Sequence, residues 1–407
     1  MRVLLYAPPG YGKSRLLAKL AAESGGRVAV FVRSHLEALQ LMKYLDKYGA
    51  TASLMFGRSA LCVHGARTLG DCLALRERGI CKAKYKYINK KIYDLNKIYE
   101  MSICPYEYLH SIGRQSKISI MPMSYLESQF YMSSILDLIN DVDLVLIDEA
   151  HNLLLNDLIV ERDAPSAVYC DGRARRCLLL PILADILRGK HLAAASASIT
   201  PPFSDIFINF LNLKFIDKDN IIYENLIIDI YKIPIRYYTR KKAEVIRTIK
   251  AIIDSAFREY KRLAVFLPNK ELVEYFKRKL SEYPVTDTPL TGVDSILLTY
   301  YRSPISEGVN LDLDAVLLIG FPLPDIRDPW VREKARMLDK LGYGGWKYAY
   351  LFAAVSGAVQ AIGRVMRGLE DRAKYVAAVD DRFWRYRAYM PRWFYKSAVL
   401  RDAPSND

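Results

Sequence analysis

Short apolar runs separated by longer amphipathic stretches recur along the whole chain. Short, largely apolar runs are typical of parallel strands that are covered by helices on both faces. They lie at Val3–Tyr6, Val28–Val32, Ile118–Met121, Leu144–Ile147, Leu263–Leu267, Ser295–Thr299 and Ala315–Ile319. Helical patterns follow several of them, as at Arg15–Ala22 and Lys270–Ser281. The alternation predicts an α/β fold with two parallel-sheet domains, which 407 residues are enough to build.

A glycine-rich loop joins the first predicted strand to the first predicted helix. Its sequence is Ala7-Pro-Pro-Gly10-Tyr-Gly12-Lys13-Ser14, with Ala7 where the usual pattern has glycine. A strand, a tight loop and a helix form the context that a P-loop requires. The loop N–H groups are expected to hold the β-phosphate, with Lys13 on the β- and γ-phosphate oxygens and Ser14 on Mg²⁺. The loop therefore predicts a nucleoside triphosphate site.

An acidic pair follows the apolar run Leu144–Ile147. The residues Asp148-Glu149-Ala150-His151 come directly after it. In a P-loop enzyme this position suits an aspartate that holds Mg²⁺ through its water shell and a glutamate that polarises the attacking water. Asp148 and Glu149 are assigned these roles, and His151 is expected to sense or relay the nucleotide state.

The second half of the chain has no P-loop of its own but carries two further motifs. Glu307 and Gly308 follow a predicted strand, and Gln360, Arg364 and Arg367 lie on a helical stretch. Arg364 and Arg367 are three residues apart, so both point from one helix face. Cations aimed across a cleft at a γ-phosphate form an arginine-finger arrangement. Two ordinary surface arginines are the alternative that this pattern leaves open.

The net charge of +14 favours a polyanionic partner, with scattered solubilising charge as the alternative. Cations alternate with tyrosines after Cys81, and Lys84, Lys86 and Tyr87 belong to that run. Charges for phosphates and rings for bases are the combination that single-strand binders use, although a solvated helix face has similar composition. Arg33 and His35 follow the strand Val28–Val32 and are expected to contact a nucleic-acid backbone or, alternatively, to lie in a solvated loop with Ser34 as helix cap.

Four of the six cysteines lie close together, at Cys62, Cys72, Cys81 and Cys104. Thiolates in a complete set of four suit an iron–sulfur cluster, whereas zinc is usually gripped by paired, short-spaced cysteines. The residues alone are compatible with an iron–sulfur cluster, a zinc ion or four unliganded thiols. Cys170 and Cys177 are expected to be buried free thiols.

The first residues lack the long apolar region of a signal peptide, and no apolar run approaches the ~20 residues that span a bilayer. We therefore expect a soluble cytoplasmic protein without membrane contact.

In order along the chain, these motifs resemble those of the XPD/DinG-type iron–sulfur helicases of superfamily 2. The matching segments are Ala7–Ser14 (motif I), Val32–His35 (Ia), Asp148–His151 (II), Ser196–Thr200 (III), Val265–Pro268 (IV), Glu307–Gly308 (V) and Gln360–Arg367 (VI). Four cysteines between motifs Ia and II, the last in Cys104-Pro105-Tyr106, are similar to the cluster signature of that family.

The resemblance implies two RecA-like motor domains and a small cysteine-ligated cluster domain inserted in the first. The expected bounds are 1–56 and 111–200 for motor domain 1, 57–110 for the cluster domain, 152–192 for a short arch remnant and 201–407 for motor domain 2. The implied cofactors are ATP, Mg²⁺ and a structural 4Fe–4S cluster on the four cysteines, with zinc as the alternative. Glu307 and Gly308 join the implied nucleotide site, and Gln360 the catalytic residues.

The implied activity is ATP-driven translocation, 5′ to 3′, along single-stranded or forked DNA by a monomer. The chain departs from the family in the wide cysteine spacing, in Ala7, in the short arch and in starting at the first strand, without the upstream segment that contacts adenine. A short arch leaves the DNA pore open or completed by a protein partner. Two other functions therefore stay in view: a nucleic-acid-binding clamp or adaptor with weak ATPase activity, and a DNA-dependent ATPase that displaces proteins without unwinding.

Overall fold

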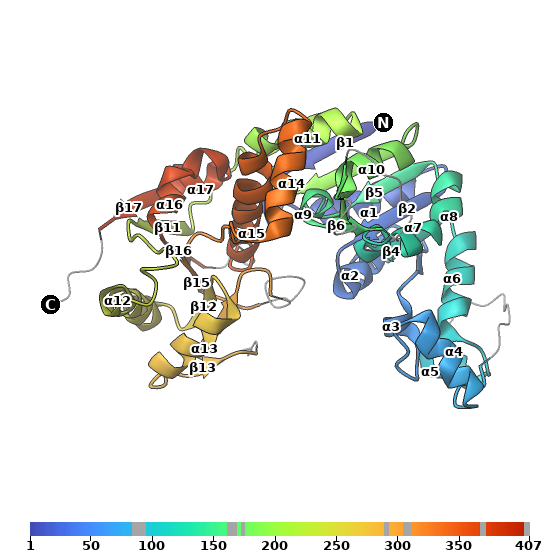
Figure 1. Cartoon of the computed structure of the whole chain (residues 1–407), viewed down its shortest axis with the longest axis horizontal. Helices are drawn as coiled ribbons and strands as arrows, with labels where there is room; N and C mark the ends of the chain where they lie inside the picture. Colours follow the sequence, from blue (N-terminus) through green and yellow to red (C-terminus); the bar gives the residue numbers. More distant parts are fainter. Residues whose placement is uncertain are drawn as a thin grey trace.

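The computed structural model describes residues 1–83, 95–160, 169–171, 176–288, 293–303, 311–366 and 372–402. In these residues the chain forms two seven-stranded sheets and one small three-stranded sheet (Figure 1). All strand pairs of the two large sheets are parallel. The predicted fold class of two parallel-sheet α/β domains is therefore confirmed.

The first sheet has the strand order β10-β1-β9-β5-β2-β4-β3. Its strands are β1 (Arg2–Tyr6), β2 (Val28–Val32), β3 (Ser53–Leu54), β4 (Ile118–Pro122), β5 (Leu144–Ile147), β9 (His191–Ser196) and β10 (Lys214–Asp217). In the register of β1 and β9, Tyr6 lies opposite Ser196, and Ile147 of β5 lies opposite Ala194. The carboxyl ends of β1 and β9 are thus level and β5 ends opposite Ala194, close to them, which places the segments after all three strands at one edge of the sheet.

Helices connect the strands of this sheet. They are α1 (Lys13–Glu23), α2 (His35–Lys47), α6 (Pro105–Gln115), α7 (Gln129–Ser133), α8 (Leu136–Asp141), α9 (Asn152–Leu155), α10 (Leu179–Ile186) and α11 (Pro201–Leu211). Because α11 leads into β10, the first domain continues past residue 200, where its end was expected, and the second domain begins after β10.

The second sheet has the order β13-β14-β12-β15-β16-β11-β17. Its strands are β11 (Leu226–Tyr231), β12 (Arg262–Leu267), β13 (Val285–Thr286), β14 (Ser295–Tyr300), β15 (Ala315–Ile319), β16 (Lys374–Val379) and β17 (Ala398–Arg401). Its helices are α12 (Ala243–Glu259), α13 (Lys270–Lys279), α14 (Pro329–Lys340), α15 (Phe352–Ile362), α16 (Asp381–Arg385) and α17 (Arg392–Ser397). A π-helical turn at Trp346–Leu351 runs directly into α15.

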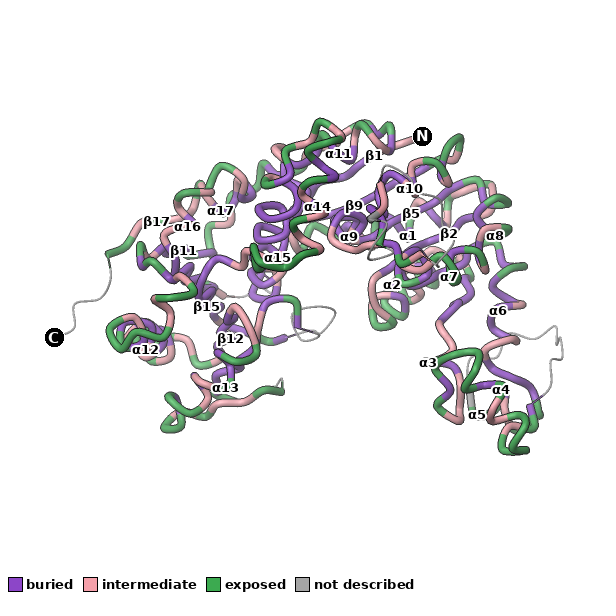
Figure 2. The backbone as a smooth tube through the Cα atoms, viewed as in Figure 1, coloured by how far each residue is buried: buried purple, intermediate pink, exposed green. Residues whose placement is uncertain are grey.

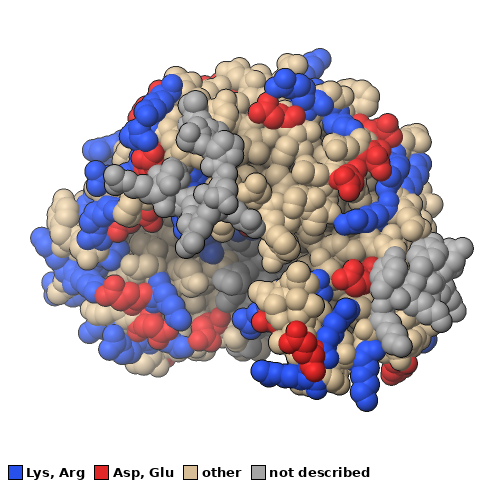
Figure 3. All heavy atoms as spheres, turned by 45° about the vertical axis from the view of Figure 1, so that its right-hand side comes forward, with Lys and Arg blue, Asp and Glu red and all other residues tan. Residues whose placement is uncertain are grey.

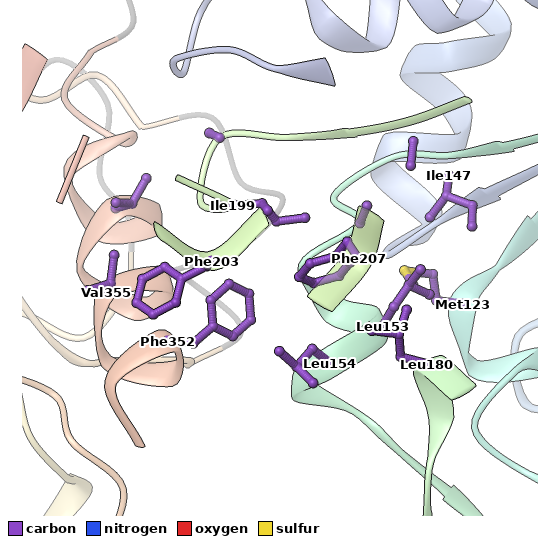
Figure 4. Packing of buried hydrophobic residues seen from close by; sticks show 14 of the residues in the cluster. Met123, Ile147, Leu153, Leu154, Leu180, Ile199, Phe203, Phe207, Phe352 and Val355 are labelled. Atoms are coloured by element: carbon purple, nitrogen blue, oxygen red, sulfur yellow. The ribbon is translucent and has the colours of Figure 1, made fainter. Parts of the chain in front are cut away.

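One hydrophobic cluster continues from the first domain into the second. Phe203 and Phe207 of α11 pack against Phe352 of α15, with ring centroids 5.1 and 5.9 Å apart (Figure 4). All three side chains are fully buried. Figure 2 shows buried residues in the strands of both sheets and in α15, alternating with intermediate and exposed ones along the chain. Burial of large aromatic side chains stabilises the docking of the two domains.

A small lobe projects from the first domain (Figure 1). It contains α3 (Arg58–Leu61), α4 (Leu69–Glu77) and α5 (Leu95–Glu100), and α3 and α5 contact α6. Thr68 begins α4 with a capping box, in which its hydroxyl accepts from the Asp71 N–H and Asp71 accepts from the Thr68 N–H. All four cysteines of the expected cluster domain lie on this lobe or at its junction with α6.

The segment expected as an arch remnant contains the three-stranded antiparallel sheet β6-β8-β7. Its strands are β6 (Asp157–Ile159), β7 (Cys170–Asp171) and β8 (Arg176–Leu178). Cys170 and Cys177 lie opposite each other in β7 and β8 and form a disulfide. Their expected state as free thiols was wrong, because the hairpin register that brings the two side chains together is not visible in the spacing of the residues.

No helix among the described residues is both long and apolar enough to cross a bilayer.

Candidate active site

A cavity of about 1070 Å³ lies where the level strand ends of the first domain meet the end of α15 from the second. The P-loop, α2 and the segment after β5 line it, together with Gln360, Gly363 and Arg364. Figure 3 shows a hollowed face of the molecule on which lysines and arginines alternate with acidic residues around the hollow. The described cations on that face do not form one continuous basic patch.

The P-loop begins one residue after β1 and ends at α1. Gly10 and Gly12 have φ values of 81° and 88°, in the left-handed region that side chains with a Cβ disfavour. The buried Lys13 ammonium donates to the carbonyls of Ala7 and Pro8 at 3.1 and 3.0 Å. Burial lowers the pKa of Lys13, and the charges of Glu149 and Asp148 oppose that shift. The loop thus holds a desolvated cation at the N-terminus of a helix, which is a suitable site for phosphate.

Ser14 and Asp148 form a direct pair across the site. The Ser14 hydroxyl donates to Asp148 Oδ2 at 2.5 Å. The Asp148 side chain is only 4% exposed, and burial together with the charge of Glu149 raises the pKa of its carboxyl to about 6. Hydroxyl and carboxylate oxygens are hard ligands of the kind that Mg²⁺ prefers. This pair therefore fits a magnesium ion beside the phosphate site.

Glu149 carries the most constrained carboxylate of the site. Its backbone has φ 51°, a left-handed conformation that is uncommon for a residue other than glycine. Burial alone would raise the pKa of Glu149, but His151 and the charges of Lys13 and Arg364 lower it to about 2. His151 Nδ1 lies 3.2 Å from Glu149 Oε2 and 3.1 Å from Ser196 Oγ at the end of β9. A carboxylate that stays ionised in this way is suited to polarise water.

The second domain reaches the same carboxylate. Gln360 of α15 donates from Nε2 to Glu149 Oε2 and to Ser198 Oγ, both at 3.3 Å. Arg364 is 7% exposed, and its charge helps to lower the pKa of Glu149. A Cβ on Gly363 would approach the Pro9 side chain to 3.3 Å, so the end of α15 packs closely on the P-loop. Arg367, Glu307 and Gly308 lie outside the described residues.

The expected nucleic-acid contacts are only partly described. Arg33 lines the cavity and donates from Nη1 to Asn152 Oδ1 at 3.1 Å. His35 is exposed at the start of α2 and stacks on Phe56 with ring centroids 4.0 Å apart. Ser34 caps α2, as one of the two readings predicted. Lys84, Lys86 and Tyr87 lie outside the described residues.

The four lobe cysteines are free thiols. Cys62 follows α3, Cys72 lies in α4, Cys81 comes shortly after that helix, and Cys104 caps α6. Burial raises the pKa of the Cys104 thiol. Across the described ranges, no three His, Cys, Asp or Glu side chains are gathered as a metal site. In number and chemistry the donor set nevertheless fits a cysteine-ligated cluster, because all four thiols are on one lobe and none is consumed by a disulfide.

Two residues of the site were not anticipated. Asn152 follows His151 directly and is almost fully buried between Arg33 and Glu149. Glu37 completes a capping box with Ser34, and burial with the charges of Glu149 and Asp148 raises the pKa of its carboxyl to about 7. The spacing Ser34-x-x-Glu37 is a readable capping-box signal, but the proximity of Glu37 to the acidic pair follows from the fold alone.

Two family models match the chain, one in each domain. The DEAD_2 family matches residues 52–163, and the helicase C-terminal domain family matches residues 244–397. Together these two models account for more than half of the chain.

Two curated proteins are similar over shorter segments. The general transcription and DNA repair factor IIH helicase subunit XPD/RAD3 of Saccharomyces cerevisiae is 33% identical over 119 residues, which are 28% of this chain and 15% of that protein. The ATP-dependent DNA helicase chl-1 of Caenorhabditis elegans is 24% identical over 176 residues, which are 36% of this chain and 21% of that protein. The matched segments thus span about a fifth or less of either relative.

Solved structures share the fold over the whole chain. An XPD helicase structure superposes with a TM-score of 0.73 at 15% identity, covering 99% of this chain and 96% of the other. The structure of Xpd4 from S. tokodaii superposes with a TM-score of 0.62 at 15% identity, covering 98% and 96%. At such identity the likeness establishes the fold. The chain thus carries a DEAD_2 match followed by a helicase C-terminal domain match, on a fold that it shares with XPD helicase structures.

Proposed function

We propose that this protein is an ATP-dependent DNA helicase or translocase. The observation that carries the proposal is the convergence of both domains on one carboxylate, since Lys13 of the P-loop, Gln360 of α15 and Arg364 just after that helix all act on Glu149. A site shared by two domains changes when the domains move relative to each other. Hydrolysis in such a site is therefore coupled to motion along a bound strand.

The residues of the cavity divide the chemistry among them. Lys13 and the loop N–H groups would bind the phosphates, and Ser14 and Asp148 would hold Mg²⁺, which supplies charge neutralisation at the phosphates. Glu149 would polarise the attacking water, held in place by His151 and Gln360. Arg364 would balance the charge that develops on the phosphoryl group. By resemblance, Arg367, Glu307 and Gly308 complete the site.

The proposed second ligand is single-stranded or forked DNA. One curated relative is named as the helicase subunit of a transcription and DNA repair factor and another as an ATP-dependent DNA helicase, and the net charge of +14 suits a polyanion. The proposed contacts are Arg33 and His35, which follow β2, and Lys84, Lys86 and Tyr87, which follow Cys81 in the sequence. The direction, 5′ to 3′, and action as a cytoplasmic monomer are proposed from the resemblance.

The proposed third group is a 4Fe–4S cluster on Cys62, Cys72, Cys81 and Cys104. Its support is the set of four free thiols on one lobe, and its contribution would be the folding energy of a segment with little core of its own. Iron and zinc assays on anaerobically purified protein test it. Four irons per chain with brown visible absorption support the cluster, whereas one zinc per chain would support a zinc site on the same cysteines instead.

ATP turnover with and without an oligo(dT) strand tests the central proposal. We expect turnover to rise at least tenfold with the strand, and Glu149→Gln to keep nucleotide affinity while it loses turnover by about 100-fold or more. Turnover of the variant at the parental rate would remove Glu149 from the mechanism. Turnover of the parent without any response to the strand would favour a nucleic-acid-binding clamp with weak ATPase activity.

One observation favours a second candidate, a DNA-dependent ATPase that displaces proteins without unwinding. The segment between α9 and α10 provides only the small sheet β6-β8-β7 in the described residues, where a larger arch is expected in the family. A forked-duplex unwinding assay run beside a protein-displacement assay separates the two. Displacement without unwinding would support the second candidate, unless an added protein partner restores unwinding.

A further inference from the structure

The short helix α9 begins directly after the acidic pair, and Asn152 is its first residue. The Asn152 side chain is 1% exposed and contacts two groups from different parts of the chain. Its Nδ2 donates to the Glu149 carbonyl at 3.0 Å, and its Oδ1 accepts from Arg33 Nη1 at 3.1 Å. A guanidinium only donates and a carbonyl only accepts, so the amide has one orientation that satisfies both contacts.

The Glu149 backbone needs such support. With φ 51° it occupies a left-handed conformation that is unfavourable for a residue with a Cβ and persists only where the surroundings hold it. The Glu149 N–H donates to Asp148 Oδ1 at 3.0 Å. Its carbonyl accepts from both the backbone N–H and the side chain of Asn152, each at 3.0 Å. Asn152 therefore holds the peptide that determines where the Glu149 carboxylate points.

The backbone of Arg33 is in turn fixed by Glu37. Its backbone N–H donates to Glu37 Oε2 at 3.0 Å, and the Ser34 N–H donates to the same oxygen at 3.2 Å. This capping box makes the Arg33 backbone part of the rigid start of α2. The guanidinium lines the cavity and lies near the carboxylate of Glu127, whose pKa it helps to keep down against burial. Arg33 is thus a cation at a strand end with one hydrogen bond committed to Asn152.

We propose that Asn152 is a positioning residue for Glu149 and that Arg33, by orienting the Asn152 amide, couples binding at the end of β2 to hydrolysis. A nucleic-acid phosphate that engages Arg33 pairs with its charge and shifts the position of the guanidinium, and the Asn152 amide transmits that shift to the Glu149 peptide. The inference rests on the proposed function and adds to it a route between the two ligands.

Steady-state ATP turnover in the full-length protein, with and without oligo(dT), tests the route. Asn152→Asp keeps the acceptor for Arg33 but places an acceptor against the Glu149 carbonyl. Because small misplacements of a reacting group lower rates steeply, we expect kcat to fall by about 10- to 100-fold with KM and nucleotide affinity unchanged within about twofold. Asn156→Ala is the matched control, since this amide at the opposite end of the same helix donates to Glu127 and not to Glu149. It should keep the parental kcat.

A double-mutant cycle measured without DNA tests whether Arg33 and Asn152 act on kcat through one route or each lower it independently. Arg33→Ala and Asn152→Ala should each lower kcat, and the double variant should lower it no further than Asn152→Ala alone. Arg33→Ala should also lose the response to oligo(dT), which Arg33→Lys restores only in part because an ammonium lacks the fixed guanidinium geometry.

The outcomes of these experiments are distinguishable. A parental kcat in Asn152→Asp, or losses in the double variant that multiply, would overturn the positioning role. If Asn152→Ala does not fold, the isosteric Asn152→Asp and its unfolding midpoint carry the test. If the parent protein does not respond to oligo(dT), the proposed function fails first. If the parent responds and Asn152→Asp behaves like it, only the present inference fails.

Discussion

Replacing Asp148 by asparagine should stabilise the nucleotide-free protein. Burial and the charge of Glu149 raise the pKa of the Asp148 carboxyl from 3.8 to about 6. Because of this raised pKa, ionisation of the buried Asp148 side chain lowers the unfolding free energy of the parent by about 3 kcal/mol near neutral pH. Asparagine has nearly the same shape and no charge to desolvate. Its single amide oxygen accepts a hydrogen bond from only one of two donors, the Ser14 hydroxyl or the Glu149 N–H, and loss of the other bond costs about 1 kcal/mol. The net gain in unfolding free energy is therefore about 2 kcal/mol.

The gain must depend on pH with a definite sign. Below pH 3.8 the carboxyl is neutral in the folded and unfolded states, so Asp148 does not lower the unfolding free energy of the parent. As pH rises from 3.8 to about 6, the unfolded chain ionises first and the parent loses stability. Above about pH 6 both states are ionised and the difference levels off. The advantage of Asp148→Asn should therefore be about 1 kcal/mol larger at pH 8 than at pH 5.

Urea unfolding in EDTA at the two pH values measures this difference. Asp143→Asn is the control, because it makes the same change from carboxylate to amide at an exposed side chain just before the start of β5. With saturating MgATP the order should reverse, since the parent gains about 2.7 kcal/mol at 100 times its Kd and the variant lacks the metal ligand. A variant that is less stable at both pH values, or equally changed at pH 5 and pH 8, would refute the reasoning.

Three further predictions concern the interdomain contact, the lobe and the small sheet. Lys334→Ala should lower the unfolding free energy by about 3 kcal/mol, because the buried ammonium of α14 donates to Asp157 at 3.1 Å and to carbonyls of α9. Lys347→Ala is the control, because it removes the more exposed ion pair with Asp205 of α11 and should lower the unfolding free energy by less than about 1 kcal/mol in the same urea titration. Equal losses in the two variants would contradict a role for the buried contact. Cys104→Ser should lose visible absorption and iron, and retention of both would exclude this thiol as a ligand. Cys177→Ser should lower stability by about 2 kcal/mol, and dithiothreitol should reproduce that loss in the parent but leave the variant unchanged.

Much of the candidate site could be predicted because it is written in contiguous residues. A strand, a glycine-rich loop and a helix form locally, so Lys13 and Ser14 could be assigned roles before the fold was known. The acidic pair was recognisable for the same reason, since an apolar strand delivers it to a sheet edge. A helix cap at Ser34 was one of the two alternatives that the residue types indicated, and the structure shows that cap.

Other contacts join positions far apart in the sequence and could not be predicted from it. Gln360 meets Glu149 only because α15 docks on the P-loop through a shared hydrophobic core. Arg33 meets Asn152 because β2 and β5 are neighbours in the first sheet. The disulfide depends on a hairpin register, and the extent of the first domain depends on β10 joining its edge.

By itself, the sequence determined the class of fold, the order of the motifs and the chemistry that each strand end carries, because these depend on local periodicity and on residue type. The tertiary structure alone decided which of those groups meet, how deeply each is buried and hence how its pKa shifts. Desolvation and charge–charge interaction depend on distance in space. A carboxylate such as Glu149 therefore acquires its ionisation state, its strained backbone and its partners only when two sheets and the helix between them have packed.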